Sequence, residues 1–167
     1  MRFATLCTVL LFACGAARAE SLTLVGEASL RVLFWDIYNS RLYTETGSYE
    51  RYQRPLRLEI EYQRDIPSDA LVDRTGTEWD AQGLDHENQA AWLARLRELW
   101  PDVQQGDRLA LELGEDNRSY FTLNGETLGA VDDTDFGQHF VDIWLSPRTT
   151  RPELRTALIG YEEASAP

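Results

Sequence analysis

The chain has 167 residues, of which 43% are hydrophobic and 26% are charged. This composition is typical of one globular domain and too apolar for a disordered chain. All 16 basic residues are arginine, and 28 acidic residues bring the formal net charge to −12. The absence of lysine excludes Schiff-base and P-loop chemistry. So acidic a surface repels nucleic-acid phosphates, and we expect no nucleic-acid partner.

The first 19 residues have the pattern of a secretory signal peptide. Met1-Arg2 is a short positive start, residues 3–13 are largely apolar, and Ala17-Arg18-Ala19 matches a small-x-small cleavage site. The apolar run is too short to span a bilayer. We therefore expect cleavage after Ala19, a periplasmic or secreted location, and a single domain over residues 20–167 without a transmembrane segment.

Both cysteines, Cys7 and Cys14, lie within this predicted signal peptide. The expected mature domain has neither a disulfide nor a thiol nucleophile, so its core alone must stabilise it. Lipidation at Cys14 is the alternative processing route, although Phe12 is bulky where a lipoprotein motif prefers a small residue.

The first half of the predicted domain has strand patterns. Residues 22–25 form a short candidate strand, and residues 30–38 form a long run that is apolar on both faces between Val32 and Trp35. Such a run predicts a central strand that is covered on both sides. Residues 56–63 alternate between apolar and polar side chains, which is typical of a strand with one solvent-exposed face.

The middle of the chain predicts two helices. Ser68 is the candidate N-cap of a helix over residues 69–82, in which apolar side chains recur every four residues. Asp85 is the candidate N-cap of a second helix, which carries Trp92 on its apolar face and which Pro101 ends.

The last third of the chain predicts two strands and two helices. Residues 108–113 and 119–123 have strand patterns, and Asn124-Gly125 is typical of a tight hairpin turn. A third helix is expected within residues 133–147, and residues 150–153 read as the capping box of a fourth. This order predicts an α+β fold, in which helices pack on one face of a largely antiparallel sheet.

Arg31 is the charged residue of greatest interest, because it lies near the start of the most apolar predicted strand. A guanidinium keeps its charge, so a buried one requires an anion or several acceptors. Arg31 could form an internal salt bridge with an acidic residue, extend its charged end to solvent, or form a site for the anionic head group of a ligand. The tryptophans are expected mostly in the core, with one or two lining an apolar pocket.

His86 and His139 are the candidate imidazole bases. Asp135 and Asp142 lie at helical spacing from His139, which allows a carboxylate-supported base or a weak metal site. An ordinary polar helix face has the same pattern. We therefore expect no metal site and no cofactor.

Four segments resemble chalcone isomerase-like domains, in particular an exported bacterial branch of that family. These segments are residues 30–43, 101–109, 121–129 and 140–149, the last with residues 154–158 that follow it. They cover nearly the whole predicted domain in the order of the family. The resemblance implies a curved antiparallel sheet with helices packed on one face.

The family implies a site in a cleft between the sheet and the helices. Plant enzymes of the wider family cyclise chalcones to flavanones there, using an arginine, a tyrosine and polar partners. Non-catalytic relatives bind fatty acids there, with arginine and tyrosine on the carboxylate. Arg31 and Tyr38 lie in the corresponding strand of this chain. The catalytic tyrosine–lysine–asparagine helix has no match, since residues 75–79 read Thr-Gly-Thr-Glu-Trp.

We therefore expect an exported, non-catalytic protein that binds a small apolar or fatty-acid-like ligand. Arg31 would face the anionic end of that ligand, and Tyr38 would donate a hydrogen bond. Two alternatives stay open. One is an intramolecular lyase or isomerase of chalcone type, in which the same arginine stabilises a phenolate or enolate. The other is a scaffold or partner-binding protein whose cleft is filled by Trp and Phe side chains.

Overall fold

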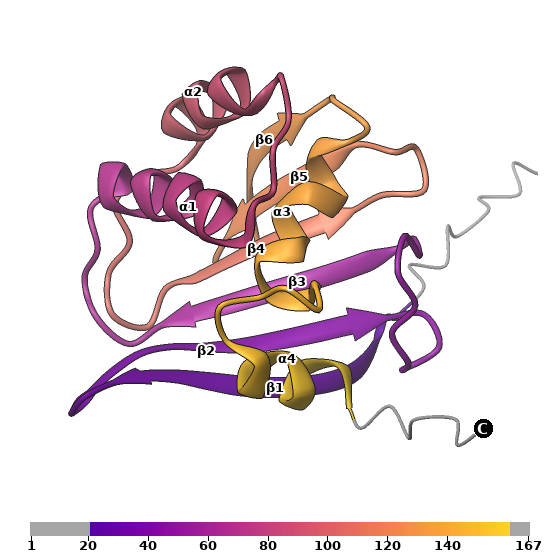
Figure 1. Ribbon diagram of the computed structural model, residues 1–167, viewed down its shortest axis with the longest axis horizontal. Coiled ribbons are helices and arrows are strands. Elements are labelled where there is room, and N and C mark those ends of the chain that lie inside the picture. The colour runs from indigo at the N-terminus through magenta and orange to yellow at the C-terminus, as the bar shows by residue number, and fades with distance from the viewer. Residues whose placement is uncertain (1–20, 161–167) are drawn as a thin grey trace, which may run out of the picture.

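The computed structural model describes residues 21–160, and the predicted signal peptide over residues 1–19 lies outside them. The described chain forms a six-stranded sheet with four helices (Figure 1). The strands are β1 (Thr23–Val32), β2 (Trp35–Thr44), β3 (Leu56–Tyr62), β4 (Arg108–Leu113), β5 (Ser119–Leu123) and β6 (Glu126–Val131). The helices are α1 (Ser68–Gln82), α2 (Gln89–Leu99), α3 (Phe136–Leu145) and α4 (Pro152–Ile159).

The strands lie in the sheet in chain order, and each is antiparallel to its neighbour. The helices cover one face of the sheet, where α4 packs against β1 and β2, and α2 packs against β6 (Figure 1). This arrangement confirms the predicted α+β fold with an antiparallel sheet. No helix within residues 21–160 combines the length and the apolar character needed to cross a membrane.

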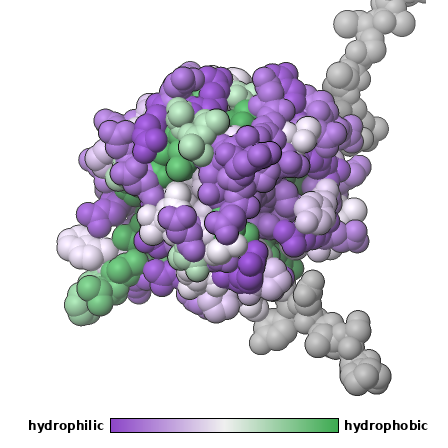
Figure 2. Space-filling view, turned by 45° about the horizontal axis from the view of Figure 1, so that its top comes forward, coloured by the Kyte–Doolittle hydropathy of each residue, from purple (hydrophilic) through white to green (hydrophobic). Residues whose placement is uncertain are grey.

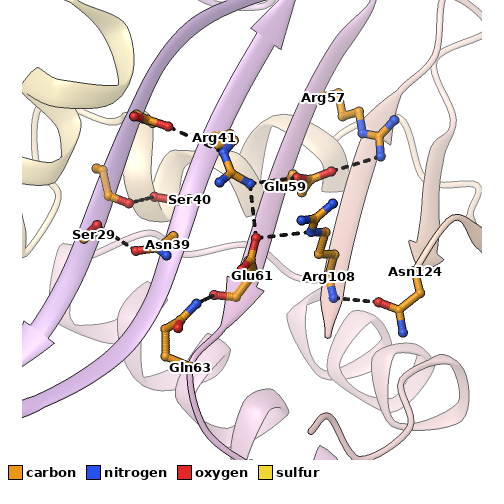
Figure 3. A network of polar contacts seen from close by, with 12 residues as sticks. Ser29, Asn39, Ser40, Arg41, Arg57, Glu59, Glu61, Gln63, Arg108 and Asn124 are labelled. Atoms are coloured by element: carbon orange, nitrogen blue, oxygen red, sulfur yellow. Dashed lines mark hydrogen bonds and ion pairs between the residues drawn. The ribbon is translucent and has the colours of Figure 1, made fainter. Parts of the chain in front are cut away.

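The alternating pattern of β3 separates the two faces of the sheet. Its inward side chains are buried under the helices: Leu56, Leu58, Ile60 and Tyr62. Its outward side chains join a network of ion pairs on the opposite face (Figure 3). In that network Arg41 of β2 contacts Glu59 and Glu61 at 3.3 Å each, and Arg108 of β4 contacts Glu61 at 3.1 Å. Because the outer face is polar, an apolar ligand site must lie on the helix-covered face.

The predicted central strand over residues 30–38 is wrong. The chain reverses at Leu33-Phe34, so that Val32 pairs with Trp35 and the run becomes a hairpin between β1 and β2. β1 is consequently an edge strand. The prediction failed for two reasons. Apolar runs are usually buried, and this turn contains none of the Gly, Asn or Asp residues that usually mark a hairpin.

Three predicted helix caps are also wrong. Asp85 is not the N-cap of α2, because that helix begins at Gln89 after Asn88. Ser68 is already part of α1, and its hydroxyl donates to the carbonyl oxygen of Trp100 at 2.8 Å instead of capping the helix. The capping box between Thr150 and Glu153 does not form. The Thr150 hydroxyl instead donates to the carboxylate of Glu78 at 2.7 Å, which ties the segment before α4 to α1.

An aromatic core joins the helices to one another. Trp79 of α1 is 1% exposed and contacts Trp92 of α2 and His139 of α3, whose ring centroids lie 6.0 and 5.0 Å from its own. Its indole N–H donates to the carbonyl oxygen of His139 at 3.2 Å. Trp79 therefore connects three helices through one side chain.

The contact between α4 and β1 leaves no room for a side chain at Gly26. A Cβ atom there would lie 2.3 Å from the carbonyl oxygen of Ala157 and 2.7 Å from that of Leu158. Both neighbours are backbone atoms, which cannot rotate away as a flexible side chain could. Glycine at this position thus allows α4, and the segment that precedes it, to pack directly on the first strand.

Candidate functional site

A cavity of about 390 Å³ lies between the inner face of the sheet, α1 and α3. Small-molecule sites commonly have volumes of about 300–1,000 Å³. The lining is mainly apolar and includes Leu58, Ile60, Leu109, Leu111, Phe121 and Phe140. The scaffold hypothesis requires a cleft that is filled by Trp and Phe side chains. The open volume of this cavity does not fit that hypothesis.

The polar groups of the cavity gather around Tyr38. Arg74 and Glu78 are one turn apart on α1, and Thr150 and Arg151 come from the segment before α4. The Glu78 carboxylate accepts hydrogen bonds from the Arg74 guanidinium and the Thr150 hydroxyl. Glu78 is only 8% exposed, so these two donors compensate for a buried negative charge.

Among residues 21–160, Arg151 is the cation of this cavity for which no ion pair with a carboxylate is found. The ion pairs within residues 21–160 include Arg74 with Glu78 but none with Arg151. Its side chain is half-buried and lines the cavity. Two guanidinium groups and one carboxylate give this region a surplus positive charge, in a protein with a net charge of −12. The arrangement suits a carboxylate ligand.

Tyr38 offers the cavity a neutral hydrogen-bond donor. Its hydroxyl oxygen accepts from the indole N–H of Trp144 at 2.9 Å, and the hydrogen bonds found within residues 21–160 give its proton no acceptor. Burial raises the pKa of Tyr38 to about 12, and the Trp144 hydrogen bond opposes this shift. The phenol therefore stays protonated at neutral pH, where a ligand carboxylate is ionised.

In a spectrophotometric titration of the folded protein, we expect Tyr38 to ionise near pH 12. The unfolded chain releases the same proton near about pH 10, so the raised pKa contributes stability that is complete below that pH. This contribution is lost as the pH rises from about 10 to 12. The Tyr38→Phe variant should have one late-titrating phenol fewer and lose less stability over that range, although burial also raises the pKa of Tyr62, which still titrates late. Identical titration curves for the two proteins would contradict the assignment.

Arg31 lies outside the cavity, on the hairpin between β1 and β2. Its side chain is 67% exposed, and its Nε atom contacts Oδ1 of Asp36 at 2.7 Å. The reversal of the chain at Leu33-Phe34 leaves it on the outward side of an edge strand. The structure therefore brings Tyr38 together with Arg151 and not with Arg31.

Three residues of the cavity were not singled out from the sequence. Arg74 and Glu78 have the i,i+4 spacing of a helical ion pair, which is a signal that could have indicated their contact. No local pattern connects Arg151 with Tyr38, because the two residues are far apart in the chain and meet only through the packing of α4 and α1 around the sheet.

The histidines lie away from the cavity lining. Nε2 of His139 lies 2.8 Å from the side-chain nitrogen of Gln89, while the carboxylate of Asp142 accepts from Arg51 at 2.5 Å. His86 stacks on Trp92. Within the described part of the chain, no three or more His, Cys, Asp or Glu side chains lie close enough to hold a metal ion.

An antiparallel sheet that encloses an apolar cavity beneath helices defines an α+β domain with a small-molecule pocket. The model of the chalcone isomerase-like family matches residues 15–160, and the chain belongs to that family.

Two individual proteins resemble this chain. An uncharacterized protein of Haemophilus influenzae is 28% identical over 141 residues, which are 84% of this chain and 69% of that protein. The crystal structure of a fatty-acid binding protein of Arabidopsis thaliana superimposes with a TM-score of 0.55 at 13% identity, over 84% of this chain and 85% of that one. At this identity the plant structure establishes a shared fold.

Proposed function

We propose that this protein binds the anion of a fatty acid or a similar acyl compound without transforming it. The acyl chain would occupy the cavity, and the carboxylate would lie between Arg151 and Tyr38. The observation that carries the proposal is a guanidinium without a carboxylate partner in the described part of the chain, placed with a neutral phenol donor at a cavity whose other walls are mainly apolar.

The acyl chain and the carboxylate of such a ligand contribute to the free energy of binding in different ways. Each methylene group that leaves water for the apolar walls contributes about 0.8 kcal/mol. The carboxylate would accept charge-assisted hydrogen bonds from Arg151 and a further one from Tyr38. The Glu78 carboxylate already pairs with Arg74, and it repels the carboxylate of a ligand. The ligand carboxylate is therefore expected to bind Arg151.

The family and the leader pattern extend this proposal. The plant protein of the same fold is named as a fatty-acid binding protein, which supports an acyl ligand for this fold. We also propose that the protein belongs to an exported bacterial branch of the family and acts in the periplasm or outside the cell. This part rests on the predicted signal peptide over residues 1–19.

The test compares palmitate with its methyl ester. The protein is expressed with its leader, recovered from the periplasm and freed of bound lipid, and its intact mass reports whether the chain is cleaved after Ala19. Calorimetric titration should show one palmitate per chain, with the uncharged ester bound at least tenfold more weakly because Arg151 gains no anion.

Binding of neither compound would overturn the proposal, and equal affinities would remove the assigned role of the cation. The isomerase alternative is tested with the same sample. If the protein converts a chalcone, the loss of chalcone absorbance will show catalysis and contradict a purely binding function.

A further inference from the structure

The tip of the β1–β2 hairpin, residues 32–35, is a projecting group of exposed apolar side chains. The exposed fractions are 41% for Val32, 83% for Leu33, 94% for Phe34 and 64% for Trp35. The hairpin extends beyond the neighbouring strands in Figure 1, and its tip forms the apolar projection at the lower left of Figure 2. Single exposed apolar residues are ordinary, but four in succession usually mark a contact site.

The turn at this tip is made without the residue that turns of this kind prefer. Leu33 has φ +55° and is the first residue of a two-residue hairpin loop. Glycine is the usual residue where the first position of such a loop has positive φ, because a Cβ atom is strained there. The positive φ disfavours leucine at this position, and the exposed side chain contributes little to the folded core. Leu33 is therefore a candidate for contact with another molecule.

The apolar surface of the hairpin continues into the cavity. Leu30 and Val32 of β1 and Ile37 of β2 line it, and Val32 also belongs to the exposed tip. A partner that contacts the tip therefore lies beside the apolar walls of the cavity. We infer that the hairpin tip inserts into the surface of a lipid bilayer and holds the cavity next to the membrane.

The size of the tip favours a bilayer over a second protein surface. Four partly exposed side chains at the end of a narrow hairpin offer a few hundred Å². A stable protein interface buries about 800 Å² on each partner. A narrow group that contains Trp and Phe matches the boundary between headgroups and acyl chains, where aromatic side chains partition.

The charges next to the tip favour a zwitterionic lipid. Arg31 pairs with Asp36, and the guanidinium of Arg64 lies 5.5 Å from the ring centroid of Trp35. Arg31 and Asp36 thus neutralise each other beside the tip, and Arg64 adds one positive charge there, while the whole protein carries a net charge of −12. The phosphate of a zwitterionic headgroup can meet this single charge without adding net negative charge to the membrane, so binding should depend little on salt.

The experiment uses the mature protein and phosphatidylcholine vesicles. Co-sedimentation should show binding that the Leu33→Ser/Phe34→Ser double variant lowers at least tenfold, because two apolar side chains no longer leave water. The matched control is Leu24→Ser, which changes an apolar side chain of 45% exposure near the other end of β1. It should bind vesicles as the native protein does.

Lipid brominated in the acyl chain should quench tryptophan fluorescence of the native protein, and Trp35→Phe should remove this quenching. Absence of vesicle binding, or equal binding by the double variant, would overturn the inference. So would a native dimer that the double variant abolishes, since the tip would then bind a second copy.

The choice of a lipid partner rests in part on the proposed acyl ligand, but the two proposals fail separately. Palmitate affinity in solution should be the same for the native protein and the double variant. A protein that binds vesicles but not palmitate would contradict only the proposed function, and one that binds palmitate but not vesicles would contradict only the membrane contact.

Discussion

Replacement of Arg151 with alanine is expected to lower the affinity for palmitate about a hundredfold. Within residues 21–160 this guanidinium forms no ion pair with a carboxylate, so its loss leaves the ligand anion beside Glu78 with the Tyr38 hydroxyl as its proposed donor. Removal of one partner from a buried, hydrogen-bonded charge pair costs about 2–5 kcal/mol. Each 1.4 kcal/mol, approximately, corresponds to a tenfold change in affinity, which calorimetric titration resolves.

Arg31→Ala is the matched control for this prediction. It removes the same side chain and the same charge, but from an exposed ion pair with Asp36 outside the cavity. Its palmitate affinity should equal that of the native protein, and the methyl ester should bind the native protein and Arg151→Ala almost equally. A comparable loss of palmitate affinity in both arginine variants would show that overall charge, and not the cavity, determines binding.

Replacement of Trp79 with alanine is expected to lower the free energy of unfolding by about 3–5 kcal/mol, the range for removal of a fully buried aromatic side chain. Trp79 contacts Trp92 and His139 and donates a hydrogen bond to the backbone of α3. The variant loses these contacts and gains an internal cavity. Urea denaturation followed by circular dichroism measures the change, which is a large part of the 5–15 kcal/mol or so that stabilises a typical domain.

The control for this second prediction is Trp35→Ala, at the exposed hairpin tip. Trp35 is 64% exposed, so its removal should alter the free energy of unfolding by less than about 0.5 kcal/mol. A similar destabilisation by both substitutions would mean that the aromatic cluster between the helices does not stabilise the fold in the way that its packing implies.

The sequence predicted the fold class because most elements carry their own local pattern. The alternation over β3 and the helical spacing of α3 each identify an element and its buried face. The region of residues 30–38 broke this rule, since its exposed apolar tip has the composition of a buried strand. A hydrophobic pattern predicts which side chains are buried, because apolar side chains usually are. The prediction fails where apolar side chains are exposed.

The candidate site was predictable only in part. The family resemblance led to Tyr38, which lines the cavity. Arg31 was chosen because it precedes apolar residues, but the side chain of an edge strand can face either way, and this one faces solvent. Arg151 lies before a short helix near the end of the described chain, and its position depends on contacts between distant segments that one sequence does not reveal.

The close packing at Gly26 bears on how the protein assembles. The carbonyl groups that it contacts, on Ala157 and Leu158, come from nearly the opposite end of the described chain. During synthesis, the inner side of the first hairpin therefore stays uncovered until the chain has been made as far as residues 157 and 158. Contacts of such long sequence separation form slowly. The incompletely synthesised chain therefore exposes an apolar surface, and we expect chaperones to protect it from aggregation.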